Sequence, residues 1–445
     1  MPSPTKIGPF PYFPLEFTKD GAVNKDDQLA ALVDALTKPT GNQVVTDLLV
    51  ISHGWNDDIP EAEELYTTIG DRISAVLPKQ SPACATVRGR KVIVCGILWP
   101  SKKFDDKSLI PGGAASMSAG GASVADATAA VDLLASFVDT PDSKKALARA
   151  KALVPSLADS LEARDEFVRI VRAFMPHSAN DEEPVVADDF FTLGGDELLR
   201  RLSRPTPGAA GASGMGGAAG LGDWIGKAVD GAKSLANLVT YYQMKNRAGD
   251  IGQGGVHDVL QRIRGQRPAD GPQALRIHLA GHSFGCRLVT AAAAGAPGST
   301  PLPVNSLTLL QAAFSHFAFA VSYDGMHDGF YRRVETDPVR VRGVTAITFT
   351  AKDKAVGLAY PLASRIARQI AAALGDANDP YGGLGRNGAQ KTPGAQAVAL
   401  QGVSSPYSFV PRGIYNLDSN AIIGGHSDLG HDEVAFALIS VIAAS

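Results

Sequence analysis

Residues 274–294 read ALRIHLAGHSFGCRLVTAAAA and combine three local patterns in one short stretch. The apolar run 274–280 predicts a buried β-strand, and residues 286–294 continue with helical character. Between them, GHSFG (281–285) has the form G-x-S-x-G. A sharp strand-to-helix turn lifts a serine hydroxyl above the edge of a sheet, and its glycines leave room for close backbone approach. The stretch therefore predicts an α/β fold in which the hydroxyl of Ser283 stands above the sheet edge at the end of a strand.

The same alternation of strand and helix recurs on both sides of this stretch. Short apolar runs that end in turn residues predict further strands at 44–52, 91–98, 304–310, 344–350 and 413–420. Helical spacing and first-turn acids predict helices over 60–77 and 433–444. This alternation is typical of a mostly parallel sheet covered by helices on both faces. We therefore expect one large α/β core built from residues 44–101 and 253–445.

Residues 102–252 interrupt the alternation with a segment rich in Ala and Gly. The segment is too long for an ordinary connection, so it predicts a large inserted helical cap or lid. Helices are expected at 125–137, at 143–174 with a break near Pro155, and at 221–244. In the last helix, apolar residues from Leu221 to Tyr242 fall on one broad face. This face either packs on the core or contacts a lipid-like substrate, with transient contact to a membrane surface as a further interpretation.

Composition and charge exclude several classes of protein. The chain has 42 Lys+Arg against 45 Asp+Glu, a formal net charge of −3, and so lacks the basic excess typical of nucleic-acid binders. Three cysteines are too few for a disulfide framework. Residues 1–43 lack a secretory signal, and their prolines predict an extended arm over the surface before a first strand and helix. No run is apolar enough to span a membrane, so we expect a cytoplasmic protein without an integral membrane segment.

A nucleophilic serine needs a base, and the base needs an acid that orients it. In α/β-hydrolase arrangements the chain order is Ser, then acid, then His, and Ser283, Asp353 and His426 follow that order. Asp353 follows the strand predicted at 344–350, and His426 follows the strand at 413–420. The rival acids are Asp324 and Asp328, which follow an earlier strand, and the rival base is His431.

The loop of His426 also allows a different interpretation. His426, Asp428, His431 and Asp432 lie within seven positions and together could bind a divalent metal. That interpretation leaves the serine turn and Asp353 unexplained, so we expect neither a metal nor a cofactor.

An oxyanion hole requires two backbone N–H groups aimed where negative charge develops. One is expected from Phe284, the residue after the nucleophile. The other is expected from the loop after the strand at 44–52, where Gly54 allows close approach. Trp55 is the favoured donor in that loop, with Gly54 and Asn56 as alternatives.

The motifs DLLVISHGW, WPS, LAGHSFG, TFTAKDKAVG and GGHSDLG together resemble the α/β-hydrolase superfamily. The combination of HGW, WPS and GHSFG is similar to uncharacterised bacterial serine hydrolases of the esterase and lipase type. The resemblance covers residues 44–101 and 253–445. It implies a Ser–His–Asp triad, a covalent acyl-enzyme and hydrolysis without a cofactor.

We therefore expect an enzyme that cleaves carboxylic esters, with a small-molecule or lipid-like ester as its substrate. An amidase, peptidase or thioesterase would use the same machinery. Because hydrolase folds also occur in proteins without activity, a non-catalytic binding protein is the alternative from another class.

Overall fold

The computed structural model describes residues 3–38, 44–101, 122–175, 189–203, 221–271, 274–336, 340–356 and 382–445. The chain divides into two compact units. We call the first the sheet unit, which comprises Met1–Lys102, Arg247–Val356 and Gly383–Ser445. We call the second the helical unit, which comprises Lys103–Asn246 and Gly357–Gly382. Its first segment begins one residue after the predicted start of the insertion at 102 and ends six residues before the predicted end at 252.

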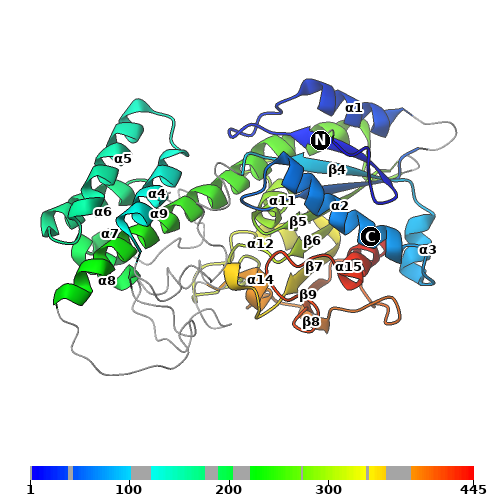
Figure 1. Ribbon diagram of the computed structural model, residues 1–445. Helices are drawn as coiled ribbons and strands as arrows, with labels where there is room; N and C mark the ends of the chain where they lie inside the picture. Colours follow the sequence, from blue (N-terminus) through cyan, green and yellow to red (C-terminus); the bar gives the residue numbers. More distant parts are fainter. Residues whose placement is uncertain are drawn as a thin grey trace. The chain divides into compact units, whose positions relative to one another are not determined.

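One sheet contains the strands of the described residues, in the order β1-β2-β4-β3-β5-β6-β7-β9-β8 (Figure 1). All neighbouring strands are parallel except β1 and β2. The strands are β1 (Lys6–Ile7), β2 (Phe10–Glu16), β3 (Asp47–Ser52), β4 (Val92–Leu98), β5 (Arg276–His282), β6 (Val304–Leu310), β7 (Val341–Phe349), β8 (Ala395–Ala399) and β9 (Ile414–Asp418). The predicted α/β class with a mostly parallel sheet is confirmed.

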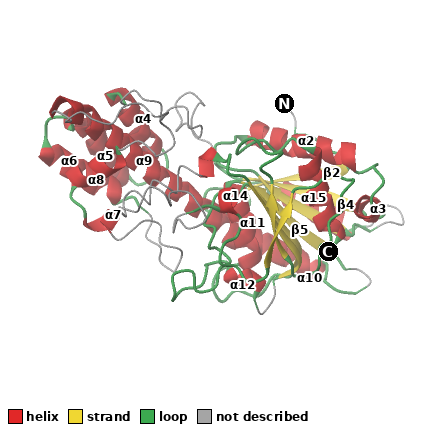
Figure 2. Ribbon diagram, turned by 90° about the horizontal axis from the view of Figure 1, so that it is seen from below, coloured by secondary structure: helices red, strands yellow, loops and turns green. Residues whose placement is uncertain are grey.

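Helices cover both faces of this sheet (Figure 2). They are α1 (Asp26–Thr37), α2 (Ile59–Val76), α3 (Pro82–Arg88), α10 (His257–Gln266), α11 (Phe284–Ala294), α12 (Arg332–Glu335), α14 (Leu384–Asn387) and α15 (Asp432–Ala443). Side chains alternate between the two faces of a strand. Leu49 and Ile51 of β3 join one buried apolar cluster with Tyr66 of α2 and Phe436 of α15. Helices α10 and α11 lie on the opposite face, and α11 packs against β3, β5 and β6.

The strand and helix predicted within residues 1–43 are present as β2 and α1. Because β2 is paired within the sheet, the prediction of an extended arm over the surface is wrong. Strand β2 pairs in parallel with β4, from Tyr12 opposite Val94 to Glu16 opposite Leu98. The N–H groups of Tyr12 and Glu16 point away from β4 and bond to Thr5 O and Gln28 Oε1. Pro14 has the same orientation because alternate residues of a strand share it. Its missing N–H therefore removes no hydrogen bond to β4, and the prolines are compatible with a strand.

The edge strand β8 was not predicted. Its five residues are exposed or half-buried, because β8 pairs only with β9. An exposed edge strand lacks the continuous apolar run by which the buried parallel strands are recognised.

The helical unit contains α4 (Val124–Ala135), α5 (Pro141–Leu153), α6 (Leu161–Arg172), α7 (Asp189–Thr192) and α8 (Gly195–Leu202). Helix α9 (Leu221–Ile251) begins in this unit and continues past residue 246 into the sheet unit. The predicted break near Pro155 is confirmed as a short 3₁₀ turn, Val154–Ser156.

The apolar face of α9 is covered over its described side chains. Val229, Leu235, Leu238, Val239 and Tyr242 are all buried, which favours packing over contact with a lipid or a membrane. The side chains of Leu221, Trp224 and Ile225 lie outside the described residues. Among the helices of the described residues, none is both long and apolar enough to cross a membrane.

Candidate active site

Ser283 occupies the turn between β5, which ends at His282, and α11, which begins at Phe284. Its backbone has φ +56° and ψ −123°, a conformation that costs free energy for a residue other than glycine. Two backbone hydrogen bonds hold the turn: Ser283 N–H donates to Leu310 O, and Ala313 N–H donates to Ser283 O, each at 3.2 Å. The serine hydroxyl is thereby fixed at the carboxyl edge of the sheet, at the first turn of a helix whose dipole favours negative charge.

Two glycines make this turn possible. A Cβ atom on Gly285 would lie 2.3 Å from Ser52 O, and one on Gly54 would lie 2.8 Å from Ser283 Cβ. Real Cβ atoms do not approach so closely, so both positions exclude any side chain. The loop after β3 and the first turn of α11 are therefore packed directly against the serine.

The structure brings Ser283, His426 and Asp353 together. His426 Nε2 lies 2.8 Å from Ser283 Oγ, and His426 Nδ1 lies 2.8 Å from Asp353 Oδ2. When Nδ1 carries the proton, it donates to the carboxylate, and Nε2 accepts from the serine hydroxyl. The Asp353 side chain is fully buried, whereas the His426 side chain is 19% exposed. The three residues follow β5, β7 and β9, whose carboxyl ends lie at the same edge of the parallel sheet.

Asp353 is held by two further groups. Its Oδ1 accepts from Val356 N–H at 2.9 Å, and its Oδ2 also accepts from Gln311 Nε2 at 3.2 Å. Gln311 follows β6 directly and is absent from the residues predicted for the site. Its only signal in the sequence is a polar residue at the carboxyl end of a strand, the place where sites gather in parallel sheets.

His282 is a second histidine beside the base. Its Nε2 donates to His426 O at 3.0 Å, and the two rings lie 4.9 Å apart. Burial and the neighbouring His426 lower the pKa of His282 to about 4, so its ring is neutral near pH 7. Its Nδ1 is buried and has no hydrogen-bond partner within the described part of the chain. His282 therefore fixes the backbone of the base without adding a charge.

The loop after β3 is fastened by the residues that follow β4. His53 N–H donates to Tyr66 Oη at 2.9 Å, and His53 Nε2 accepts from Trp99 N–H at 3.2 Å. Trp99 Nε1 donates to His53 O at 3.1 Å, and Ser101 Oγ donates to Asp57 O at 2.7 Å. The loop with the motif HGW is therefore hydrogen-bonded to the motif WPS, and these bonds fix the loop next to Ser283.

The two residues predicted to form an oxyanion hole both lie next to Ser283. Phe284 follows it as the first residue of α11, and Trp55 follows Gly54, whose backbone touches Ser283. The rings of Trp55 and Phe284 are in contact, with centroids 5.9 Å apart. Their role as N–H donors to an oxyanion stays a prediction.

The rival acids form hydrogen bonds within their own loop. Asp324 pairs with His327 at 2.6 Å, and Asp328 accepts from Ser322 N–H at 2.9 Å. Neither is bonded to His426, whose Nδ1 instead faces Asp353.

The four residues that could bind a metal do not face a common point. His431 bonds to Asp428 at 2.8 Å and stands at the N-cap of α15, while Asp432 pairs with Lys79 at 2.8 Å. His426 faces Ser283 and Asp353 instead. Over the described ranges, no group of three or more His, Cys, Asp or Glu side chains is placed to bind a metal ion.

The geometry supplies what acyl transfer by a serine requires: a strained, fixed nucleophile, a base in hydrogen-bond contact and a buried acid behind the base. Comparison of the chain with protein-family models, with curated proteins and with solved structures finds no match. The support for a function therefore comes from the residues and distances of the site.

Proposed function

We propose that this chain is a serine hydrolase of the α/β-hydrolase type that cleaves carboxylic esters through an acyl-enzyme. The observation that carries the proposal is the series Ser283–His426–Asp353. Both of its hydrogen bonds measure 2.8 Å, and the serine stands on a positive-φ turn at the start of α11. A serine held in this way by chance would need neither the strained turn nor the two glycines packed against it.

In the proposed mechanism, Ser283 Oγ attacks the ester carbonyl carbon while His426 Nε2 removes the hydroxyl proton. Asp353 keeps His426 in the tautomer with the proton on Nδ1 and stabilises the imidazolium that forms. The tetrahedral intermediate collapses as His426 donates its proton to the leaving alcohol oxygen. Water then attacks the acyl-enzyme by the same route and releases the carboxylic acid and free Ser283.

The N–H groups of Phe284 and Trp55 are the proposed donors to the oxyanion. The hydrogen bonds from Trp99 and Ser101 support this assignment because they fix the loop that carries Trp55. A donor of this kind contributes about 10²–10³ in rate.

We further propose that the helical unit selects the acyl chain of the substrate, the role expected of a cap or lid. The chain leaves the sheet for this unit directly after β4, and Trp99 and Ser101 at that exit contact the loop beside Ser283. A cap that lines an apolar groove favours a medium or long acyl chain. Activity that fell steadily from acetyl to octanoyl esters would contradict this part of the proposal.

The test is hydrolysis of p-nitrophenyl esters of two to twelve acyl carbons by the native chain and by Ser283→Ala. The native chain is expected to turn over, and the variant to lose several orders of magnitude in kcat, because nucleophile and base act as a unit. A fluorophosphonate probe is expected to label the native chain on Ser283 and leave the variant unlabelled. Parallel assays with anilide and thioester substrates separate an esterase from an amidase or a thioesterase. A native chain that neither hydrolyses nor labels would contradict the proposal and favour a binding protein.

A further inference from the structure

Gln311 is the most constrained polar residue around the proposed triad. It is fully buried and has φ +48°, a left-handed conformation that is uncommon for a residue with a side chain. Strain of this kind persists only where the surroundings hold it, and it gathers at functional sites. The strained backbone and complete burial of Gln311 therefore point to a role in the site.

The side-chain amide of Gln311 is fully engaged. Its Nε2 donates to Asp353 Oδ2 at 3.2 Å and to Gly385 O at 3.0 Å, and its Oε1 accepts from Thr348 Oγ1 at 2.9 Å. The backbone N–H of Gln311 also donates to Thr348 Oγ1, at 3.0 Å. The amide orientation is fixed because the NH₂ group faces two acceptors, Asp353 and Gly385, while the amide oxygen faces the hydroxyl of Thr348.

We propose that Gln311 is a positioning residue that holds Asp353 in place for His426 and shares the negative charge of its carboxylate. The inference rests on the proposed hydrolase function and adds to it a residue that acts through the acid. Asp353 Oδ2 accepts from two donors, His426 Nδ1 and Gln311 Nε2. Each donor to a carboxylate disperses part of its charge and limits how its oxygen can move.

The proposal predicts two effects that can be measured separately. Without the Gln311 donor, the carboxylate of Asp353 attracts the imidazolium of His426 more strongly, which favours the protonated base. The acidic limb of the pH profile of kcat/KM then moves to higher pH. At the same time the carboxylate is held less firmly, so the alignment of His426 is poorer and kcat falls.

The experiment compares Gln311→Met, which keeps the length of the side chain and removes both donors, with a matched control. Asn416→Leu removes another buried side-chain amide, on β9, which makes two hydrogen bonds, both to the backbone of Ala389. For Gln311→Met we expect kcat on a p-nitrophenyl ester about tenfold lower, KM within about twofold, and an acidic limb displaced upward by about half a pH unit. For Asn416→Leu we expect a lower Tm, while the acidic limb of the pH profile of kcat/KM stays at the same pH.

Thr348→Val gives a graded second variant. It removes the hydroxyl that anchors the Gln311 amide but leaves the donor to Asp353, so its loss of kcat should be smaller than that of Gln311→Met. An acidic limb that stays in place in Gln311→Met, with kcat lowered only in proportion to the folded fraction, would overturn the proposal.

A second measurement does not depend on turnover. The proton on His426 Nδ1 that is shared with Asp353 should give a far-downfield ¹H NMR signal that is lost in Asp353→Asn. In Gln311→Met the pH midpoint of this signal should rise, and an unchanged midpoint would overturn the positioning role. If the native chain fails to hydrolyse or label while the midpoint still moves, the serine-hydrolase proposal fails and the contact of Gln311 with the acid stands.

Discussion

Two hydrogen-bonded series of serine, histidine and aspartate lie at opposite ends of the strands. At the carboxyl ends stand Ser283, His426 and Asp353. At the amino ends, Ser306 Oγ lies 2.8 Å from His278 Nδ1, and His278 Nε2 lies 3.0 Å from Asp47 Oδ1. Asp47 begins β3, and the other two residues lie on β5 and β6, so the second series crosses three adjacent strands. The three residue types are the same and the distances are similar, whereas the surroundings differ.

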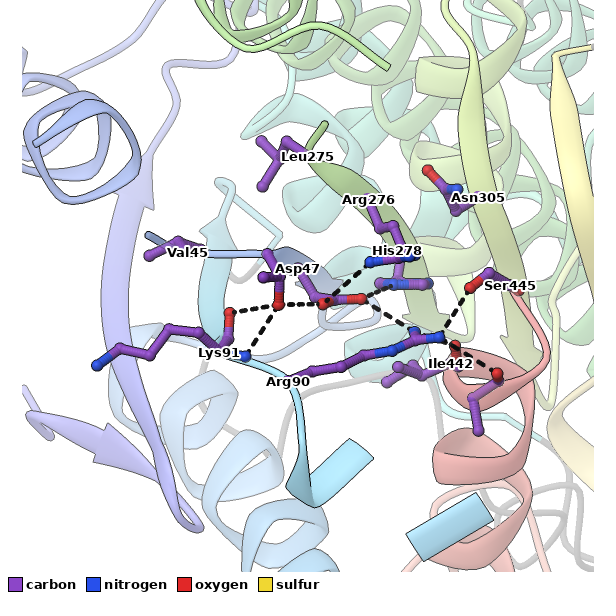
Figure 3. Close-up of polar contacts among 12 residues, drawn as sticks. Val45, Asp47, Arg90, Lys91, Leu275, Arg276, His278, Asn305, Ile442 and Ser445 are labelled. Carbon is purple, nitrogen blue, oxygen red and sulfur yellow. Dashed lines mark hydrogen bonds and ion pairs between the residues drawn. The ribbon is translucent and has the colours of Figure 1, made fainter. Parts of the chain in front are cut away.

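Asp47, His278 and Ser306 of the second series are all buried. Figure 3 shows Arg90 and Arg276 beside Asp47, whose negative charge they balance. Burial opposes ionisation of Asp47, yet the hydrogen bonds from His278 and Thr46 and the charge of Arg90 keep the pKa of this carboxyl below its ordinary value. Burial lowers the pKa of His278. Arg90 contacts Asp47 at 3.1 Å and also donates to Ile442 O at 2.7 Å, near the end of α15. This cluster therefore ties β3 and β5 to the C-terminal helix.

The contrast identifies the properties that the proposed nucleophile has and Ser306 lacks. Ser306 lies within strand β6, whereas Ser283 stands on a strained turn at the start of a helix. The histidine rings also face opposite ways: Nδ1 of His426 meets the acid, while Nδ1 of His278 meets the serine. A serine, a histidine and an aspartate in hydrogen-bond contact are not sufficient, because donors aimed where negative charge develops are also needed.

Exchanging each aspartate for asparagine should separate the two series most strongly. Asp353→Asn is expected to lower kcat on esters by about 10⁴, because the wrong tautomer of His426 is favoured. Asp47→Asn is expected to leave kcat of the folded protein unchanged and to cost about 3–5 kcal/mol of unfolding free energy, because Arg90 loses its buried partner. Ester kinetics and urea unfolding of both variants check this pair, and a comparable loss of kcat in both would contradict the division of roles.

The pH dependence of stability offers a smaller effect, which centres on His282 beside the first series. The pKa of His282 in the folded chain is about 4 and lies below its unfolded value, so the unfolded chain binds more protons between pH 4 and about 6.5. Stability should therefore fall on acidification through this window, by about 2 kcal/mol from pH 7 to pH 5. Urea unfolding at both pH values should show this loss in the native chain and a smaller one in His282→Gln. Equal losses would contradict a neutral His282.

The smallest expected effect is that of Ser306→Ala. Loss of one buried hydrogen bond to His278 should cost about 1 kcal/mol of unfolding free energy and leave ester hydrolysis within about twofold. Thermal unfolding and the p-nitrophenyl ester assay test this directly. A large fall in kcat would show that the two ends of the sheet are coupled.

The sequence predicts the first series because its local signals are strong. The turn around Ser283 is marked by glycines that close contacts demand, and Asp353 and His426 each follow a strand that apolar residues reveal. Gln311 leaves no such mark, because its role depends on a φ angle and on contacts with Asp353 and Gly385 that lie 42 and 74 residues away.

The same reasoning explains the errors in the fold. A proline in a sequence normally argues against a β-strand. Pro14 is tolerated in β2 because its nitrogen faces away from β4, where no N–H donor is needed. That orientation follows from the pairing of β2 with β4, which the local sequence does not specify. Strand β8 is exposed at an edge and lacks the apolar run that reveals a buried strand. The local sequence pattern thus identifies buried strands and sharp turns. Edge strands, and the direction in which the N–H groups of a strand point, depend instead on tertiary pairing.

The pairing of β3 with β5 also has a consequence for synthesis of the chain. Asp47 pairs with Arg276 and Ser52 with Gly281, so each residue of β3 has a partner that is translated about 230 residues later. At 5–20 residues per second, the ribosome needs roughly 10–50 s to supply that partner. During this interval the apolar strand β3 has one open edge, which is a template for pairing with other chains. Nascent chains that stall within the helical unit should therefore be the species that depends most on chaperones.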